Sequence, residues 1–136
     1  VGPRELYRDQ KAFYTDALRK LAGLAEAKGN ALLSAAEEAS ARGDADGAAG
    51  RKAEAHAHFE AAIAEWRQYL EDGGPAALDA YRKLAEFYGK TGDALNALLM
   101  TETGLTYSST DADLLKKKDS FYYSVEPERL ERVKDK

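Results

Sequence analysis

Apolar side chains recur at helical spacing along most of the chain. In segment 52–70 they follow one another at i, i+3, i+4, i+7 and i+11; they are Phe59, Ala62, Ile63, Trp66 and Leu70. In segment 81–88, Leu84 and Tyr88 stand four residues apart, and Tyr81 stands three residues before Leu84. Such stripes are typical of amphipathic helices that pack on a core. The pattern therefore predicts an all-α fold.

A tight turn between two short helices is predicted at Gly92 and Asp93. Glycine can take the left-handed conformation that ends a helix, and an aspartate can then accept hydrogen bonds from the free amides of the next helix. Ala85 and Ala97 are small, as required where two helices cross at about 8–10 Å. Segment 81–104 is therefore predicted to form an antiparallel helix hairpin.

Seven residues of this hairpin resemble, in type and order, the tetratricopeptide repeat, a helix-turn-helix unit of 34 residues. They are Tyr81, Leu84, Ala85, Tyr88, Gly92, Asp93 and Ala97. Thr101, Gly104 and Ser109 hold the places of the family's later large residue, its small partner and its closing proline. The resemblance implies stacked antiparallel helix hairpins in a short right-handed superhelix, as one domain over 1–136 with its best repeat at 78–111. An unrelated helical bundle is the alternative fold, because alanine-rich helices satisfy many templates.

Residues 4–28 are predicted to form a long leading helix that begins near Pro3 and ends at Gly29-Asn30. Its predicted inner stripe consists of Leu6, Phe13, Ala17, Leu21 and Leu24, with Tyr7, Tyr14 and Leu18 beside it. Residues 31–70 resemble a degenerate repeat in which Gly43-Asp44 repeats the Gly-Asp turn. The glycines of 44–51 disfavour an early helix start, so this segment is predicted to be a loop insertion, with the second helix over 52–70.

Residues 112–136 are predicted to form the capping helices that a stacked array needs at its end. Segment 108–111 has the composition of a turn followed by a helix cap, and Leu115 and Tyr122 then fall one 34-residue period after Tyr81 and Tyr88. Glu126-Pro127 is predicted to open a last helix, with Leu130 and Val133 on its inner side. About six to seven helices are expected in all.

Composition narrows the class of protein. The 136 residues are 44% hydrophobic and 32% charged, which is typical of soluble globular proteins. Apolar runs are too short for a membrane span, and a net charge of −4 argues against general electrostatic attraction to nucleic acid. The chain has no cysteine, so disulfides and thiolate sites are excluded. It begins Val-Gly-Pro, as expected for a processed chain or an excised domain, and its compartment stays open.

Four candidate chemical sites are each interpreted as structural. His56 and His58 stand two residues apart, so on a helix they point about 200° apart and cannot hold one metal ion. Loop 43–47 resembles a calcium loop, but Arg42 and Ala53 occupy its first and last ligand positions. The carboxylate pairs such as Glu37-Glu38 are expected on solvated faces, as is the basic run 116–118. We therefore expect no enzyme activity, metal or cofactor.

The resemblance implies that the first helices of successive hairpins line a groove that holds a peptide or a partner helix. The groove-facing places carried onto this chain are Glu37, Asp79, Arg82, Glu86, Lys90, Lys116, Ser120 and Tyr123. Arg82 and Lys116 stand one period apart and could together bind a carboxylate. The alternative is an internal network in which Arg82 pairs with Glu86, and Glu86 with Lys90.

A second hypothesis makes the chain a structural scaffold or a homo-oligomer that uses its terminal helices. The long leading helix and the aromatic cluster 121–123 are the candidates for mutual contact. The cluster either packs on the last helix or forms a contact surface. In both hypotheses the partner is a protein or peptide, and neither nucleic acid nor a membrane span is involved.

Overall fold

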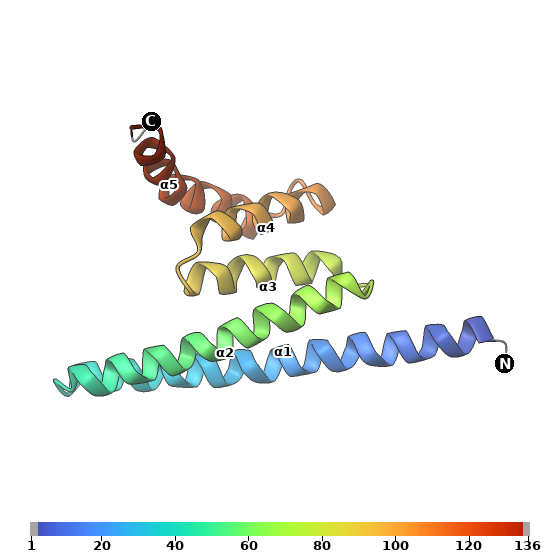
Figure 1. The fold of residues 1–136 in the computed structure, drawn as a ribbon, viewed down its shortest axis with the longest axis horizontal. Coiled ribbons are helices and arrows are strands. Elements are labelled where there is room, and N and C mark those ends of the chain that lie inside the picture. The colour runs from blue at the N-terminus through green and yellow to red at the C-terminus, as the bar shows by residue number, and fades with distance from the viewer. Residues whose placement is uncertain (1–2, 135–136) are drawn as a thin grey trace. The chain divides into compact units, whose positions relative to one another are not determined.

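The computed structural model describes residues 3–134, which form five helices. Figure 1 shows their order along the chain. They are α1 (Pro3–Ala41), α2 (Ala45–Glu71), α3 (Ala77–Lys90), α4 (Ala94–Tyr107) and α5 (Ala112–Lys134). The described residues contain no strand, so the predicted all-α class is confirmed. The chain divides into two compact units, one running to Pro75 with α1 and α2, the other starting at Ala76 with α3, α4 and α5.

The first unit is an antiparallel pair of long helices. The helix α1 has 39 residues and α2 has 27, which correspond to roughly 58 Å and 40 Å. The predicted helix end at Gly29-Asn30 is wrong, because α1 continues unbroken to Ala41. The predicted loop insertion over 44–51 is also wrong. Gly43 ends α1 at φ +80°, and the side chain of Asp44 accepts a hydrogen bond from the amide of Gly47, so α2 begins at Ala45.

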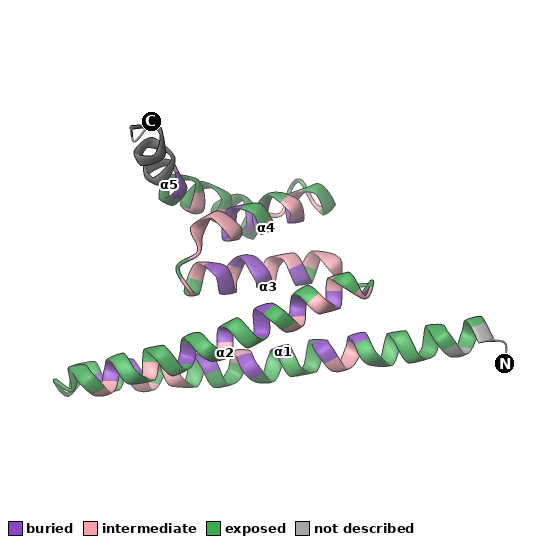
Figure 2. Cartoon of the chain, in the orientation of Figure 1, coloured by how far each residue is buried: buried purple, intermediate pink, exposed green. Residues whose placement is uncertain are grey.

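The core of the first unit is built from small residues on α1 and large residues on α2. The buried residues of α1 are Thr15, Leu18, Ala22, Ala25, Gly29, Ala36 and Ala39. Those of α2 include Ala55, Phe59, Ala62, Ile63, Trp66 and Tyr69, so four of the five positions predicted for its stripe are buried and Leu70 is half-buried. Figure 2 shows the buried stretches of both helices and the exposed N-terminal end of α1.

The predicted inner stripe of the leading helix is therefore wrong at three of its large residues, and the side chain of Leu6 lies outside the described part of the chain. Phe13, Leu21 and Leu24 are 79%, 50% and 58% exposed. A β-carbon built on Gly29 would lie 2.6 Å from the ring of Phe59, so the missing side chain makes room for that ring. The pair packs through the small face of α1, because small residues let two helices approach closely, and this leaves the large side chains on another face.

In the second unit, α3 and α4 form the predicted hairpin. Gly92 has φ +83°, and the carboxylate of Asp93 accepts a hydrogen bond from the amide of Asn96 at 3.1 Å. The four residues expected to hold the hairpin are all buried; they are Leu84, Ala85, Tyr88 and Ala97. The predicted Gly-Asp turn is thus confirmed at its dihedral angle, its cap and its core.

The helix α5 packs on α4 with a register one residue away from the predicted one. Leu114 is fully buried and Val125 is 3% exposed, whereas Leu115 and Tyr122 are 44% and 45% exposed. A β-carbon on Gly104 would lie 2.9 Å from Leu114, so the glycine of α4 provides the space that Leu114 fills. Leu115 and Tyr122 stand 34 residues after Tyr81 and Tyr88, but they do not pack on the core as that period predicts.

The C-terminal segment is one helix where two were predicted. The helix α5 continues through Pro127 to Lys134, so the described residues form five helices rather than six to seven. A single proline can bend a helix without ending it. The side chains of Leu130 and Val133 lie outside the described part of the chain.

Candidate functional site

Seven of the eight predicted groove residues belong to the second unit. The first helix of its hairpin, α3, carries Asp79, Arg82, Glu86 and Lys90, and α5 carries Lys116, Ser120 and Tyr123. Arg82 and Glu86 are half-buried, and the other five are exposed. Glu37 is exposed on α1 and therefore belongs to the first unit.

Arg82 is held by two carboxylates of its own unit. Its Nε donates to Oδ2 of Asp111 at 2.9 Å, its Nη2 also bonds Asp111, and its Nη1 donates to Oδ1 of Asp79 at 3.0 Å. The side chain of Asp111 is only 6% exposed. The hydrogen bond from Arg82 lowers the pKa of Asp111, and the same bond raises the pKa of Arg82. The guanidinium of Arg82 therefore links α3 to the residue that precedes α5.

The predicted internal network is confirmed in part. The carboxylate of Glu86 lies 3.8 Å from Nζ of Lys90, as expected, and 3.7 Å from Nζ of Lys83. The partners of Arg82 are Asp79 and Asp111 in place of Glu86. Because the donors of Arg82 are engaged in this way, a joint carboxylate clamp with Lys116 would first have to break the Asp111 contact.

A hollow of about 300 Å³ opens beside the predicted residues. Gly89, Gly92, Ala94, Phe121 and Ser124 line it. A β-carbon on Gly89 would lie 3.0 Å from the ring of Phe121, so the ring packs against bare backbone. None of these five was among the predicted site residues. Phe121 stands seven residues, or two helical turns, after Leu114 and so lies on the same side of α5. That spacing is the sequence signal that could have placed Phe121 on the packed face.

Aromatic side chains of α5 extend beyond the hollow into solvent. Tyr123 is 76% exposed, and its ring meets that of Tyr122 edge-on with centroids 6.2 Å apart. Phe121 is half-buried. The predicted packing of this cluster on a separate last helix is wrong, because Phe121 packs on Gly89 of α3, while Tyr122 and Tyr123 stay exposed.

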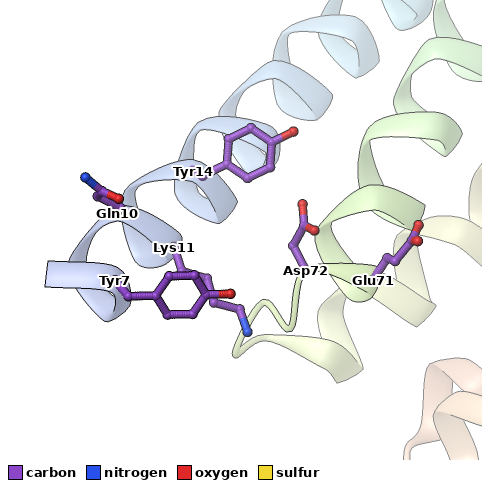
Figure 3. A pocket seen from close by; sticks show the side chains of 6 residues that line it. All are labelled: Tyr7, Gln10, Lys11, Tyr14, Glu71 and Asp72. Atoms are coloured by element: carbon purple, nitrogen blue, oxygen red, sulfur yellow. The ribbon is translucent and has the colours of Figure 1, made fainter. Parts of the chain in front are cut away.

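A second hollow, of about 320 Å³, lies in the first unit between the N-terminal part of α1 and the end of α2. Figure 3 shows Tyr7, Gln10, Lys11 and Tyr14 rising from α1, with Glu71 and Asp72 at the end of α2. The side-chain amide of Gln68 donates to Asp72 at 3.1 Å. This hollow combines aromatic and charged groups.

Among the described residues of α1, five large apolar side chains are exposed; Tyr7 and Tyr14 line the hollow at the end of α2, and the other three are not part of its lining. We define the outer stripe of α1 as Tyr7, Phe13, Tyr14, Leu21 and Leu24, which are 50% to 79% exposed. Single exposed apolar side chains are ordinary on a protein surface, whereas several along one helix form a larger apolar patch.

The described residues contain no group of three or more histidine, cysteine, aspartate or glutamate side chains placed to hold a metal ion. The carboxylate of Asp44 in the candidate calcium loop caps α2. His56 is exposed and His58 is half-buried on α2. None of the helices in the described part is long and apolar enough to cross a membrane.

Comparison of the chain with protein-family models, with curated proteins and with solved structures gave no significant match in any of the three. The resemblance of the α3–α4 hairpin to a tetratricopeptide repeat therefore rests on its own residues.

Proposed function

We propose that this chain is a non-enzymatic protein–protein interaction module of tetratricopeptide-like design, which binds a peptide or a partner helix across α3 and α5. The observation that carries the proposal is the hollow that the end of α3, the α3–α4 turn, the start of α4 and α5 line together, where the ring of Phe121 lies against the backbone at Gly89. The helix α3 opens a hairpin and α5 follows that hairpin, so by the tetratricopeptide resemblance the two would line the surface on which such an array holds its ligand.

The lining of the hollow combines polar and apolar surface. It consists of small residues, exposed backbone, the hydroxyl-bearing Ser124 and one aromatic ring, which suits a partner side chain with both an apolar part and a hydrogen-bonding group. Charged residues flank it, since Lys90 lies next to Gly89 and pairs with Glu86. Charged rim residues tune encounter rate and specificity more than affinity. We therefore expect a side chain of mixed character, such as tyrosine, as the anchor of the partner.

Filling the hollow tests this proposal. Ser124 is exposed and lines the hollow, so a Ser124→Trp variant should fold and should obstruct the site. Asp119 is also exposed on α5, and its position five residues earlier points it about 140° away from Ser124. Asp119→Trp is therefore the matched control.

Peptides would be selected against the wild-type chain from a random phage-displayed library, and their affinities measured by isothermal titration calorimetry. We expect Ser124→Trp to weaken binding of the selected peptides at least about tenfold, a difference of roughly 1.4 kcal/mol. Asp119→Trp should bind them as the wild type does. Equal binding by both variants, with unchanged circular dichroism, would exclude the hollow as the binding site.

A further inference from the structure

The outer stripe of α1 has the spacing of a two-helix seam. Tyr7, Tyr14 and Leu21 follow one another every seven residues, and Leu24 comes three residues after Leu21. These spacings place the first three at position a and Leu24 at position d of a seven-residue repeat, the two positions that a helix presents to its partner in a coiled coil. We propose that this stripe pairs with the same stripe of a second copy of the chain.

The C-terminal part of the stripe is separate from the face that α1 already uses. The helix contacts α2 through small side chains such as Ala22 and Ala25, which are 0% and 8% exposed. Leu21 and Leu24 each precede one of these alanines by one residue, and a step of one residue turns the helix by about 100°. Farther toward the N-terminus, Tyr7 and Tyr14 border the hollow at the end of α2, and a second copy on the stripe would also cover that hollow.

The seam positions without a large side chain also fit pairing. Between the stripe residues, Gln10 and Ala17 occupy the intervening positions. Ala17 leaves room for a large side chain from the opposite helix, and one polar residue such as Gln10 in an apolar seam can fix its register. Asp16 pairs on its own helix with Arg19 at 2.7 Å and with Lys20 at 3.1 Å. Each copy thus carries charges of both signs beside the seam.

The exposed area is sufficient for a dimer. A large apolar side chain presents roughly 150–250 Å², and the five members of the stripe are 50% to 79% exposed. Together they expose about 600 Å² of side-chain surface, at the upper end of what a monomer leaves uncovered. Two copies would bury about 1,200 Å² in total, the lower limit of a specific stable interface.

A second copy fits this face without any further partner. In a two-fold interface the same patch meets itself, so a self-complementary surface is required. The outer stripe meets this condition because its members are apolar and the ionic groups beside it carry both signs. Pairing of α1 is independent of the hollow in the second unit, so failure of one proposal leaves the other standing.

The mass of the full chain in solution tests the inference. Size-exclusion chromatography with light scattering, over roughly 1 μM to 1 mM, should give twice the chain mass of 14.9 kDa at the upper end. The double variant Leu21→Glu/Leu24→Glu should stay monomeric throughout, because it places four carboxylates in the seam. Both leucines are half exposed, so its helix content should match the wild type by circular dichroism.

Leu99→Glu/Leu115→Glu is the matched control, since these leucines are 46% and 44% exposed on α4 and α5. We expect this control to dimerise as the wild type does. Two results would overturn the inference. One is a wild-type chain that stays monomeric at every concentration, even if another protein is found to bind α1. The other is a dimer that persists in the Leu21→Glu/Leu24→Glu variant.

Discussion

Gly29 determines how closely α1 and α2 approach. It is buried in the middle of α1, and a β-carbon there would lie 2.6 Å from the ring of Phe59, which is itself 1% exposed. Glycine inside a helix costs about 0.5–1 kcal/mol relative to alanine. The chain tolerates this cost because the ring fills the space, whereas from sequence alone the same glycine resembles a helix end.

We expect Gly29→Ala to lower the free energy of unfolding by about 1–2 kcal/mol. Crowding a packed core costs about 1–3 kcal/mol, which exceeds the gain of about 0.5–1 kcal/mol in helix propensity. Gly23 is the control in the same helix, since a β-carbon there meets nothing within 4 Å. Gly23→Ala should therefore stabilise the chain by about 0.5–1 kcal/mol. Urea titration followed by circular dichroism would measure both, and stabilisation by both variants would show that Phe59 moves aside at little cost.

At the scale of elements, local signals predicted the hairpin but not the long pair. Gly92 and Asp93 end α3 and cap α4 within four consecutive residues, so the sequence around them contains the whole mechanism. The course of α1 depends on which face α2 covers, and the large stripe containing Phe13 and Leu21 was a reasonable but wrong choice. The small residues of α1 and Phe59 of α2 decide which face of α1 is buried. That choice depends on how the two helices pair in space, which the sequence of α1 alone does not show.

In the candidate site, too, contacts within one helix could be predicted from the sequence, whereas contacts between helices could not. The sequence predicted the Glu86–Lys90 pair, because four residues on one helix bring the two groups together. It did not predict that Arg82 bonds Asp111, which is 29 residues away and placed by the turn before α5. Phe121 was likewise missed, because the position of Leu114 against Gly104 shifts the register of α5 by one residue.

The Arg82–Asp111 contact should make the docking of α5 dependent on pH. Arg82 holds the pKa of Asp111 below the unfolded value of 3.8. A lowered pKa contributes stability that is present above the unfolded pKa and is lost as pH falls through the folded one. We expect Asp111→Asn to lower Tm by a few degrees at pH 6–7, with the difference from wild type shrinking to nothing well below pH 3.8.

Asparagine is the suitable replacement because it caps helices about as well as aspartate, so the amide of Leu114, which donates to Asp111, keeps an acceptor. Asp79 is the other partner of Arg82, and the side chain of Asp79 is 63% exposed. Asp79→Asn should therefore change Tm little at any pH. Thermal melts of the three chains from pH 2.5 to 7 would measure this. A constant gap between Asp111→Asn and wild type over that range would contradict the ionic role of Asp111.

At the scale of the whole molecule, the two proposed surfaces lie on different units of the chain. The outer stripe belongs to α1 in the first unit, and the hollow beside Phe121 belongs to the second. A chain that pairs through α1 would present two hollows per assembly. Two linked sites bind a partner that carries two matching segments far more tightly than one site does, so pairing would turn a weak peptide site into an effective scaffold.

Pairing through α1 also predicts that thermal stability depends on protein concentration. Association of folded chains stabilises them by mass action, and each tenfold rise in concentration adds about 1.4 kcal/mol per dimer. The wild-type Tm should therefore rise by a few degrees per decade once the chain is mostly dimeric. The Tm of Leu21→Glu/Leu24→Glu should stay flat, because a monomer unfolds without a change in molecule number. Differential scanning calorimetry over two decades of concentration would measure both slopes. A flat wild-type slope under conditions where light scattering shows a dimer at room temperature would mean that the dimer dissociates before the helices unfold.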